Sequence, residues 1–163
     1  MSDFINKIIT LVLIFIMLVL APLLLSYMST DMVTERLVLN DVTSFIDKVT
    51  DKGTITNKDL DTLYLDVNSH GQAYNVKVQR YIVVEEPVGN KMSGVKSTNL
   101  IYVNTDDLDR MQKKEIDQVN LNIRDVVKVH VEEINLSSGK RLLWTILRVD
   151  KGKTHFSMAG TVR

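Results

Sequence analysis

The sequence predicts an α+β protein: a long N-terminal helix, transmembrane first and then amphipathic, followed by a small antiparallel β-sheet head with short helices. An uncharged run opens the chain, an apolar stripe with helical spacing continues it, and short runs of alternating apolar and polar residues fill much of the remainder. We therefore expect a transmembrane anchor helix over residues 1–30, an amphipathic helical stem over 31–52 and an α+β soluble head over 53–163.

The anchor is predicted from charge and length. No residue between Lys7 and Asp31 carries a charge at neutral pH. At about 1.5 Å of rise per residue, roughly 21 helical residues cross a ~30 Å hydrocarbon core. Pro22 lies inside the run and predicts a kink rather than a break, because helices in lipid tolerate proline. The alternatives are a buried core helix and a cleaved signal peptide, but the apolar part of a signal peptide is usually only ~7–15 residues long and ends at a pair of small residues. We expect an uncleaved anchor.

The flanking charges predict the orientation of the anchor. Lys7 and the α-amino group precede it, whereas Asp31 and Glu35 outnumber Arg36 directly after it. The positive-inside rule then places the N-terminus in the cytoplasm and the head outside the cell membrane. The chain has no cysteine, so its hydrophobic core has to stabilise the head without disulfides. We expect a single-pass membrane protein, with a surface appendage as a further location.

Helical patterning continues past the anchor. Apolar residues recur every three or four positions after Asp31, and Gly53 follows as a C-terminal cap. We expect one helix over residues 4–52, whose stripe packs on the protein's own sheet. The stripe comprises Leu39, Val42, Ile46 and Val49, with Met32, Val38 and Phe45 alongside.

The head is predicted to alternate short helices and strands. Thr56 and Asp59 have the spacing of a capping box, which predicts a helix that ends before Gly71. Alternation then predicts a strand from Tyr74 to Val84, stopped by Pro87, and a hairpin loop over residues 87–98.

The second half of the head follows the same reasoning. A short strand is predicted over residues 100–103, and Thr105 is expected to cap a polar helix that carries Leu108 and Met111 and continues toward Val119. Alternating valines predict a strand over 127–131, helical spacing predicts a helix over 142–147, and a last strand is predicted over 156–162. The head should thus contain about four antiparallel strands.

Charge is balanced overall, which argues against a nucleic-acid surface, but it is unevenly distributed. The segment 31–76 has eight acidic and four basic residues, whereas the segment 136–163 has six basic residues and one acidic residue. The two segments either pair within one chain or join the acidic stem of one copy to the basic end of a neighbour.

Catalytic and metal-binding patterns are missing from the sequence. His70, His130 and His155 are far apart and are interpreted as surface or turn residues. The aspartates of residues 106–109 suit a helix start, and the paired glutamates at 85–86 and 132–133 are interpreted as solvated strand ends. Trp144 is interpreted as a core or interface anchor. We expect no enzymatic activity, no cofactor, no metal and no small-molecule substrate.

The order of an apolar helix, an amphipathic stem and a small antiparallel head resembles type IV pilin-like proteins. FIDKVTDKGTITNKDLDTLYLDVNSHGQAYNVKVQR (45–80), IRDVVKVHVEEIN (123–135) and FSMAGTVR (156–163) are similar to tight-adherence (TadE-like) pilus-assembly proteins of Gram-positive bacteria. The chain departs from the pilin pattern because no glycine precedes Gly53, so the glycine at which prepilin peptidase cuts is missing. The acidic residue five positions into a mature pilin helix has no clear counterpart. The resemblance then implies an unprocessed or unusually processed member.

Three functions remain open. The first is a structural subunit of a pilus or secretion-type filament, with the lipid bilayer and further copies or other pilin-like subunits as partners. The second is a single-pass accessory protein that recruits assembly partners without polymerising. The third is a membrane-anchored binding module, which a pocket lined by Tyr74, Tyr81 and Trp144 would favour. For the first, helical periodicity nominates packing residues and an intersubunit charge pair: Ile8, Leu11, Phe15, Leu18 and Pro22 for packing, and Asp3 with Lys7 for the pair.

Overall fold

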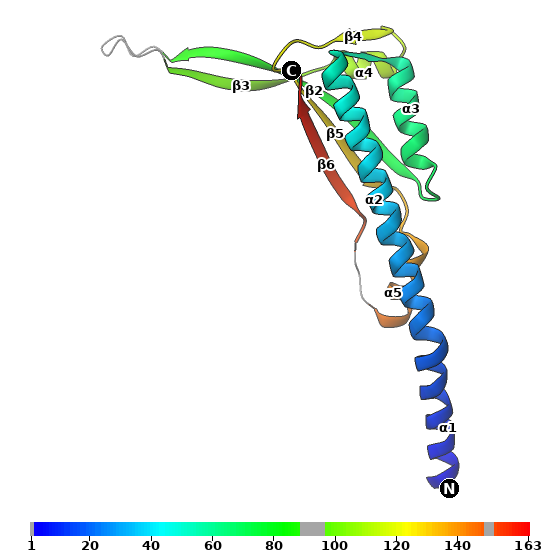
Figure 1. Ribbon diagram of the computed structural model, residues 1–163. Coiled ribbons are helices and arrows are strands. Elements are labelled where there is room, and N and C mark those ends of the chain that lie inside the picture. Colours follow the sequence, from blue (N-terminus) through cyan, green and yellow to red (C-terminus); the bar gives the residue numbers. More distant parts are fainter. Residues whose placement is uncertain (1, 89–96, 149–151) are drawn as a thin grey trace.

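The computed structural model describes residues 2–88, 97–148 and 152–163. One long helix carries a head on its C-terminal half, and its N-terminal half projects beyond the head (Figure 1). The predicted α+β arrangement is therefore confirmed. The elements in chain order are α1 (Ser2–Phe15), η1 (Ile16–Leu20), α2 (Ala21–Lys52), β1 (Thr54–Thr56), α3 (Asn57–Asn68), β2 (Tyr74–Val88), β3 (Ser97–Thr105), α4 (Asp107–Gln112), β4 (Gln118–Asn120), β5 (Val126–Glu133), α5 (Ser138–Leu147) and β6 (His155–Thr161).

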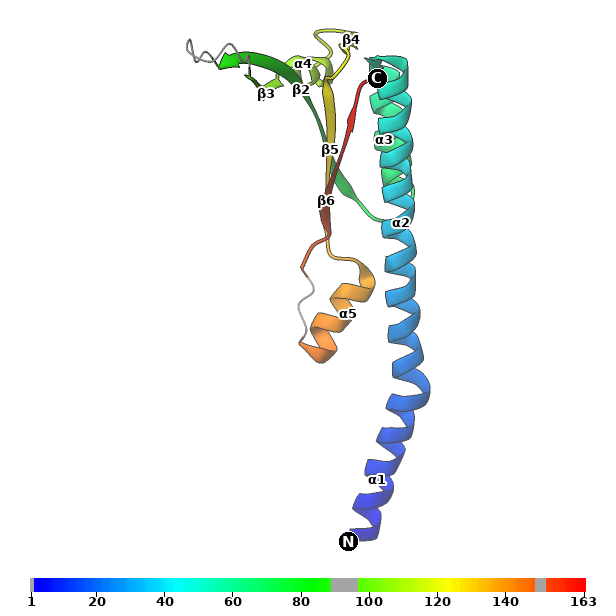
Figure 2. The ribbon, with the colours of Figure 1, turned by 60° about the vertical axis from the view of Figure 1, so that its left-hand side comes forward.

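The long helix passes through Pro22 without a break. The π-helical turn η1 lies just before the proline, with the Ala21 N–H donating to the Ile16 carbonyl. Proline lacks an N–H and its ring crowds the carbonyl four residues earlier, so a widened turn relieves the conflict. The helix axis bends in this region (Figure 2). At the other end Gly53 adopts φ +68° and donates its N–H to Val49, which confirms the predicted cap.

The main sheet has four antiparallel strands in the order β3-β2-β5-β6. The first half of β2 pairs with β5 and the second half with β3, so that Arg80 faces both Thr105 and Val127. The prediction that Pro87 stops β2 is wrong, because Pro87 pairs with Thr98 inside the strand. Beyond Tyr81, β2 no longer pairs with β5, and a strand with a free edge accommodates a missing N–H. The predicted hairpin loop falls partly on residues 89–96, which lie outside the described residues.

Two further predictions for the head need correction. Thr105 does not cap a helix: it ends β3, and its hydroxyl donates to the Arg80 carbonyl. The helix that follows, α4, ends at Gln112, and Val119 lies instead in β4, which pairs with β1 in a separate two-stranded sheet. Three-residue strands are too short to show a period, so no local pattern indicates this pairing.

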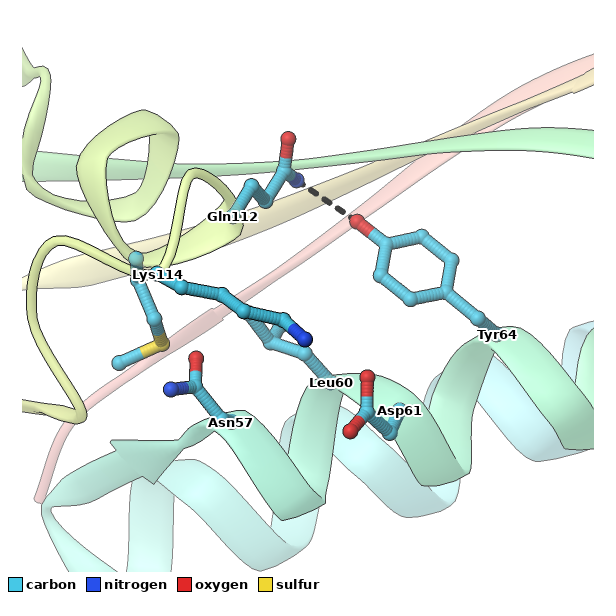
Figure 3. A pocket seen from close by; sticks show the side chains of 7 residues that line it. Asn57, Leu60, Asp61, Tyr64, Gln112 and Lys114 are labelled. Carbon is cyan, nitrogen blue, oxygen red and sulfur yellow. Dashed lines mark hydrogen bonds between the residues drawn. The ribbon is translucent and has the colours of Figure 1, made fainter.

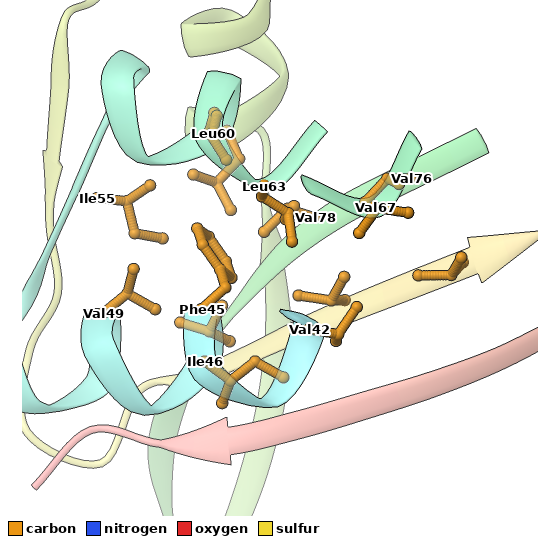
Figure 4. Packing of buried hydrophobic residues seen from close by; sticks show 14 of the residues in the cluster. Val42, Phe45, Ile46, Val49, Ile55, Leu60, Leu63, Val67, Val76 and Val78 are labelled. Carbon is orange, nitrogen blue, oxygen red and sulfur yellow. The ribbon is translucent and has the colours of Figure 1, made fainter. Parts of the chain in front are cut away.

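Helices α2 and α3 cover one face of the main sheet (Figure 2). Their apolar side chains meet the sheet in one cluster, in which Phe45 points between α2 and α3 (Figure 4). The capping box predicted at Thr56 and Asp59 is present and starts α3. The buried apolar residues of the two helices are Val38, Val42, Phe45, Ile46 and Val49 on α2, and Leu60, Leu63 and Val67 on α3.

The predicted stripe is correct except at its edge. Leu39 is 40% exposed and Met32 is also exposed, whereas Val38 is fully buried. Consecutive helical residues differ by about 100°, so the stripe centred on Val38, Val42 and Val49 turns Leu39 past the edge of the sheet. Leu39 and Met32 instead border a shallow depression beside Phe156.

Candidate membrane and assembly surface

The N-terminal half of the long helix is the largest exposed apolar surface of the described chain. The helix Asp3–Lys52 is long and apolar enough to cross a membrane, and none of its most apolar window is buried. The predicted packing residues Ile8, Leu11, Phe15 and Leu18 are all exposed, with Leu11 at 71% and Leu18 at 72%. Pro22, Asp3 and Lys7 are exposed as well. The head therefore leaves this surface open to lipid or to other helices.

The π turn divides the predicted packing stripe into two. Ile8, Leu11 and Phe15 lie on α1, but Leu18 lies within η1 and Pro22 follows it. One additional residue in a turn shifts all later residues by about 100° around the axis. Ile8, Leu11 and Phe15 therefore lie along one line of the helix surface, and Leu18 and Pro22 are rotated away from it.

A polar cluster joins the stem to the head just after the apolar run. We call it the junction cluster; it consists of Asp31, Glu35, Glu133, Ser137, Lys140 and Thr154. The Lys140 ammonium lies 2.7 Å from Glu133 and 3.3 Å from Glu35. Ser137 donates its hydroxyl to Asp31 over 2.6 Å, and Thr154 donates its hydroxyl to Glu35 over 2.6 Å. β5, α5 and the residue before β6 are thereby tied to the start of the stem.

Glu133 is the buried centre of the junction cluster and is 0% exposed. The prediction that residues 132–133 are both solvated is therefore wrong for Glu133. Burial alone would raise the pKa of its carboxyl, but hydrogen bonds from Lys140 and from the Thr154 and Ser137 N–H groups outweigh burial and lower that pKa. A sequence signal for this site exists: Glu133 continues the inward-facing alternation of the β5 valines, and a charge at an inward position needs a partner.

The Lys140–Glu35 ion pair bears on the uneven charge distribution. It joins the acidic stem to the basic C-terminal segment within one chain, as the first of the two alternatives expects. Lys140 and Glu35 therefore pair within one chain. Pairing between copies stays a prediction for the other charged residues of the stem and of the C-terminal segment.

Glycine permits close contact between the stem and the start of α5. A Cβ built on Gly139 would lie 2.6 Å from Asp31 Oδ2 and 3.2 Å from the Tyr27 carbonyl oxygen. Backbone and a hydrogen-bonded carboxylate cannot both move aside, so a larger residue would push α5 away from the stem. Gly139 therefore allows α5 to lie directly against the end of the apolar run.

Two other buried ionic groups stabilise the head. Arg80 donates to Asp125 over 2.6 Å and to Asp107 over 3.0 Å, at the point where β2 changes partners. Asp59 accepts from Thr56 and pairs with Lys48 at 2.8 Å, and these contacts lower the pKa of its carboxyl despite burial, which opposes them. Both clusters are occupied by bonds within the fold.

Two of the histidines that are predicted as surface or turn residues lie at or near the surface of the head. His70 lies 2.6 Å from Asp41, and His155 is exposed at the start of β6. Within the described ranges, no group of three or more His, Asp or Glu residues is placed to hold a metal ion.

Two cavities of the described head contain polar groups that already bond to each other. One depression of ~240 Å³ lies between α3 and α4, where the Gln112 amide donates to the Tyr64 hydroxyl over 2.6 Å (Figure 3). Sites for small molecules usually measure ~300–1,000 Å³. A cavity of ~420 Å³ lies beside the junction cluster, but its Ser137 hydroxyl is held by Asp31 and its His70 by Asp41.

The pocket that would favour a binding module does not form. Tyr74 and Tyr81 lie seven residues apart on β2, so their side chains point to opposite faces of the sheet. Tyr74 is buried next to the junction cluster, where burial and nearby carboxylates raise its pKa to about 12. Trp144 is 49% exposed on α5, which corrects its interpretation as a core residue and leaves the interface role.

No protein-family model matches the sequence, and no curated protein or solved structure matches it.

Proposed function

We propose that this chain is a non-enzymatic structural subunit of a pilus or secretion-type filament. The observation that carries the proposal is the projecting helix, whose apolar window is entirely unburied while its C-terminal half is fixed to a folded head. Such a helix rests in the bilayer before assembly, and afterwards it packs against equivalent helices in the filament centre, with the heads outside.

The length of the helix supports both states. Fifty residues correspond to about 75 Å, of which a bilayer core requires only ~30 Å. The head contacts the helix mainly through residues beyond Asp31, so the apolar part is available to lipid or helices except at its end, which lies beside α5. Association of helices in lipid depends on close packing, because lipid tails are as apolar as leucine.

The charges at the two ends of the apolar run support an extracytoplasmic head. Lys7 precedes the run, and the acidic residues Asp31 and Glu35 follow it. Near the N-terminal end, Asp3 and Lys7 are one helical turn apart on α1, where they can pair with the same residues of a neighbouring helix.

A second candidate function is a membrane-resident accessory protein of the same assembly machinery. The absence of any glycine before Gly53 favours it, because a chain that is not cut by prepilin peptidase resembles an assembly factor more than a processed subunit. Filament formation separates the two functions.

Cysteine cross-linking tests the proposal, since the chain has no native cysteine. Ile8 and Leu13 are five residues apart, about 140° around α1, so they lie on roughly opposite faces. In a filament, oxidation of the Ile8→Cys/Leu13→Cys double variant should give a ladder of dimers, trimers and larger species, and sheared filaments should contain the chain. The control is Leu65→Cys on an exposed position of α3. Species no larger than dimers, with all protein in the membrane fraction, would support the accessory function and refute the filament.

A further inference from the structure

Helix α5 lies beside the end of the apolar run. Its second residue, Gly139, approaches Tyr27, which belongs to the uncharged stretch, and its buried Leu143 borders a depression that Met28 and Met32 also line. In both views (Figures 1 and 2) α5 lies on the side of the head nearest the N-terminus, and in Figure 2 its C-terminal end lies farther from the long helix than its start does. A bilayer that holds the apolar run therefore reaches the level of α5.

The outward surface of α5 has the residue types that suit this level. Trp144 is 49% exposed, and the guanidinium of Arg148 lies 5.8 Å from the centre of its ring. Arg141 is exposed one turn earlier on the same helix. Tryptophan concentrates at membrane–water interfaces, and arginine binds phosphate oxygens in a bidentate manner. Tyr27 is a second aromatic residue, beside the start of α5.

We propose that α5 is a second membrane contact, lying in the headgroup region of the phospholipid bilayer that holds the N-terminal helix. Trp144 then inserts at the level of the lipid carbonyls, and Arg141 and Arg148 bind the lipid phosphates. The bilayer is favoured over a protein partner because the same chain places an apolar span directly beside α5. This inference rests on membrane anchoring but not on filament formation. It restricts the tilt of the head relative to the membrane, since the bilayer then holds both the long helix and α5.

The test uses the fluorescence of Trp144, which is the only tryptophan of the chain. The full chain is placed in nanodiscs of phosphatidylcholine and phosphatidylglycerol at one copy per disc. Trp144 should be quenched severalfold more by lipids brominated on the acyl chain than by iodide in the buffer. Its emission should lie to the blue of a control tryptophan. Equal quenching by iodide in Trp144 and the control, without an effect of brominated lipid, would overturn the proposal.

Two variants in a Trp144→Phe background make the result unambiguous. Tyr102→Trp puts the probe on β3, away from the stem, and should respond only to iodide. Leu13→Trp puts it in the middle of the apolar run and should respond only to brominated lipid. If Leu13→Trp responds as expected and Trp144 does not, anchoring holds and the α5 contact is refuted. If Trp144 is shielded only in discs that hold several copies, a second chain covers α5, which also refutes the bilayer contact.

Discussion

Replacing Lys140 by methionine should destabilise the head, because the buried carboxylate of Glu133 then has no cationic partner. Methionine keeps most of the side-chain volume but removes the ammonium that lies 2.7 Å from Glu133. Glu133 is 0% exposed and would retain only the N–H groups of Ser137 and Thr154. Breaking a buried ion pair from one side typically costs about 3–5 kcal/mol. Because two hydrogen bonds remain, we expect the low end, about 3 kcal/mol, a large share of the ~5–15 kcal/mol of a typical domain.

Urea unfolding of the full chain in detergent micelles, followed by far-ultraviolet circular dichroism, measures this loss. The midpoint should move to lower urea with an unchanged slope. Lys153→Met is the matched control, because Lys153 is exposed on the approach to β6 and should change stability by less than about 0.5 kcal/mol.

A double-variant cycle isolates the pair itself. In Lys140→Met/Glu133→Gln no buried charge is left uncompensated, so the combined loss should be smaller than the sum of the single losses by about 1–3 kcal/mol. A Lys140→Met protein as stable as the control, or strictly additive losses, would refute the role assigned to the junction cluster.

Three further predictions concern packing, pH and the π turn. Gly160→Val builds a Cβ 2.3 Å from Ile46 Cγ2 and should cost about 1–3 kcal/mol in the same unfolding assay; an unchanged midpoint would contradict the close approach of β6 to α2. The pKa of Glu133 is lowered from its ordinary value of 4.5, so its ionised form contributes stability that is present above pH 4.5 and lost as pH falls through the folded-state pKa. Glu133→Gln should therefore weaken the acid dependence of unfolding, and an identical pH profile would argue against it. Pro22→Ala restores an N–H for the Leu18 carbonyl, so a spin-label accessibility scan should find one continuous 3.6-residue period; a persisting break before residue 22 would mean that proline does not cause the π turn.

The elements that the sequence predicts well are those whose physical causes are local. The long helix follows from an apolar run and a stripe, its end from a glycine that adopts φ +68°, and the start of α3 from the Thr56–Asp59 capping box. Each of these depends on residues a few positions apart, so the chain determines them before any tertiary contact forms.

The wrong predictions concern residues whose structure depends on a partner far away in the sequence. Pro87 continues β2 because β5 stops pairing at Tyr81, and Val119 joins β4 because Thr54–Thr56 lies opposite it. Leu39 is exposed because it lies one helical position beyond Val38, which is buried. None of these outcomes has a local periodic signal.

Local patterns were enough to predict the membrane-length helix, the amphipathic stem, the Gly53 cap and the Thr56–Asp59 capping box. The burial of Glu133, the pairing of Lys140 with the stem and the contact of α5 with the end of the apolar run depend on tertiary contacts. These contacts join residues that are far apart in the sequence. Ser137 and Asp31 are 106 positions apart in the sequence, and Thr154 and Glu35 are 119 positions apart. Only the pairing of strands and the packing of α2 bring these hydroxyl and carboxylate groups within hydrogen-bond distance.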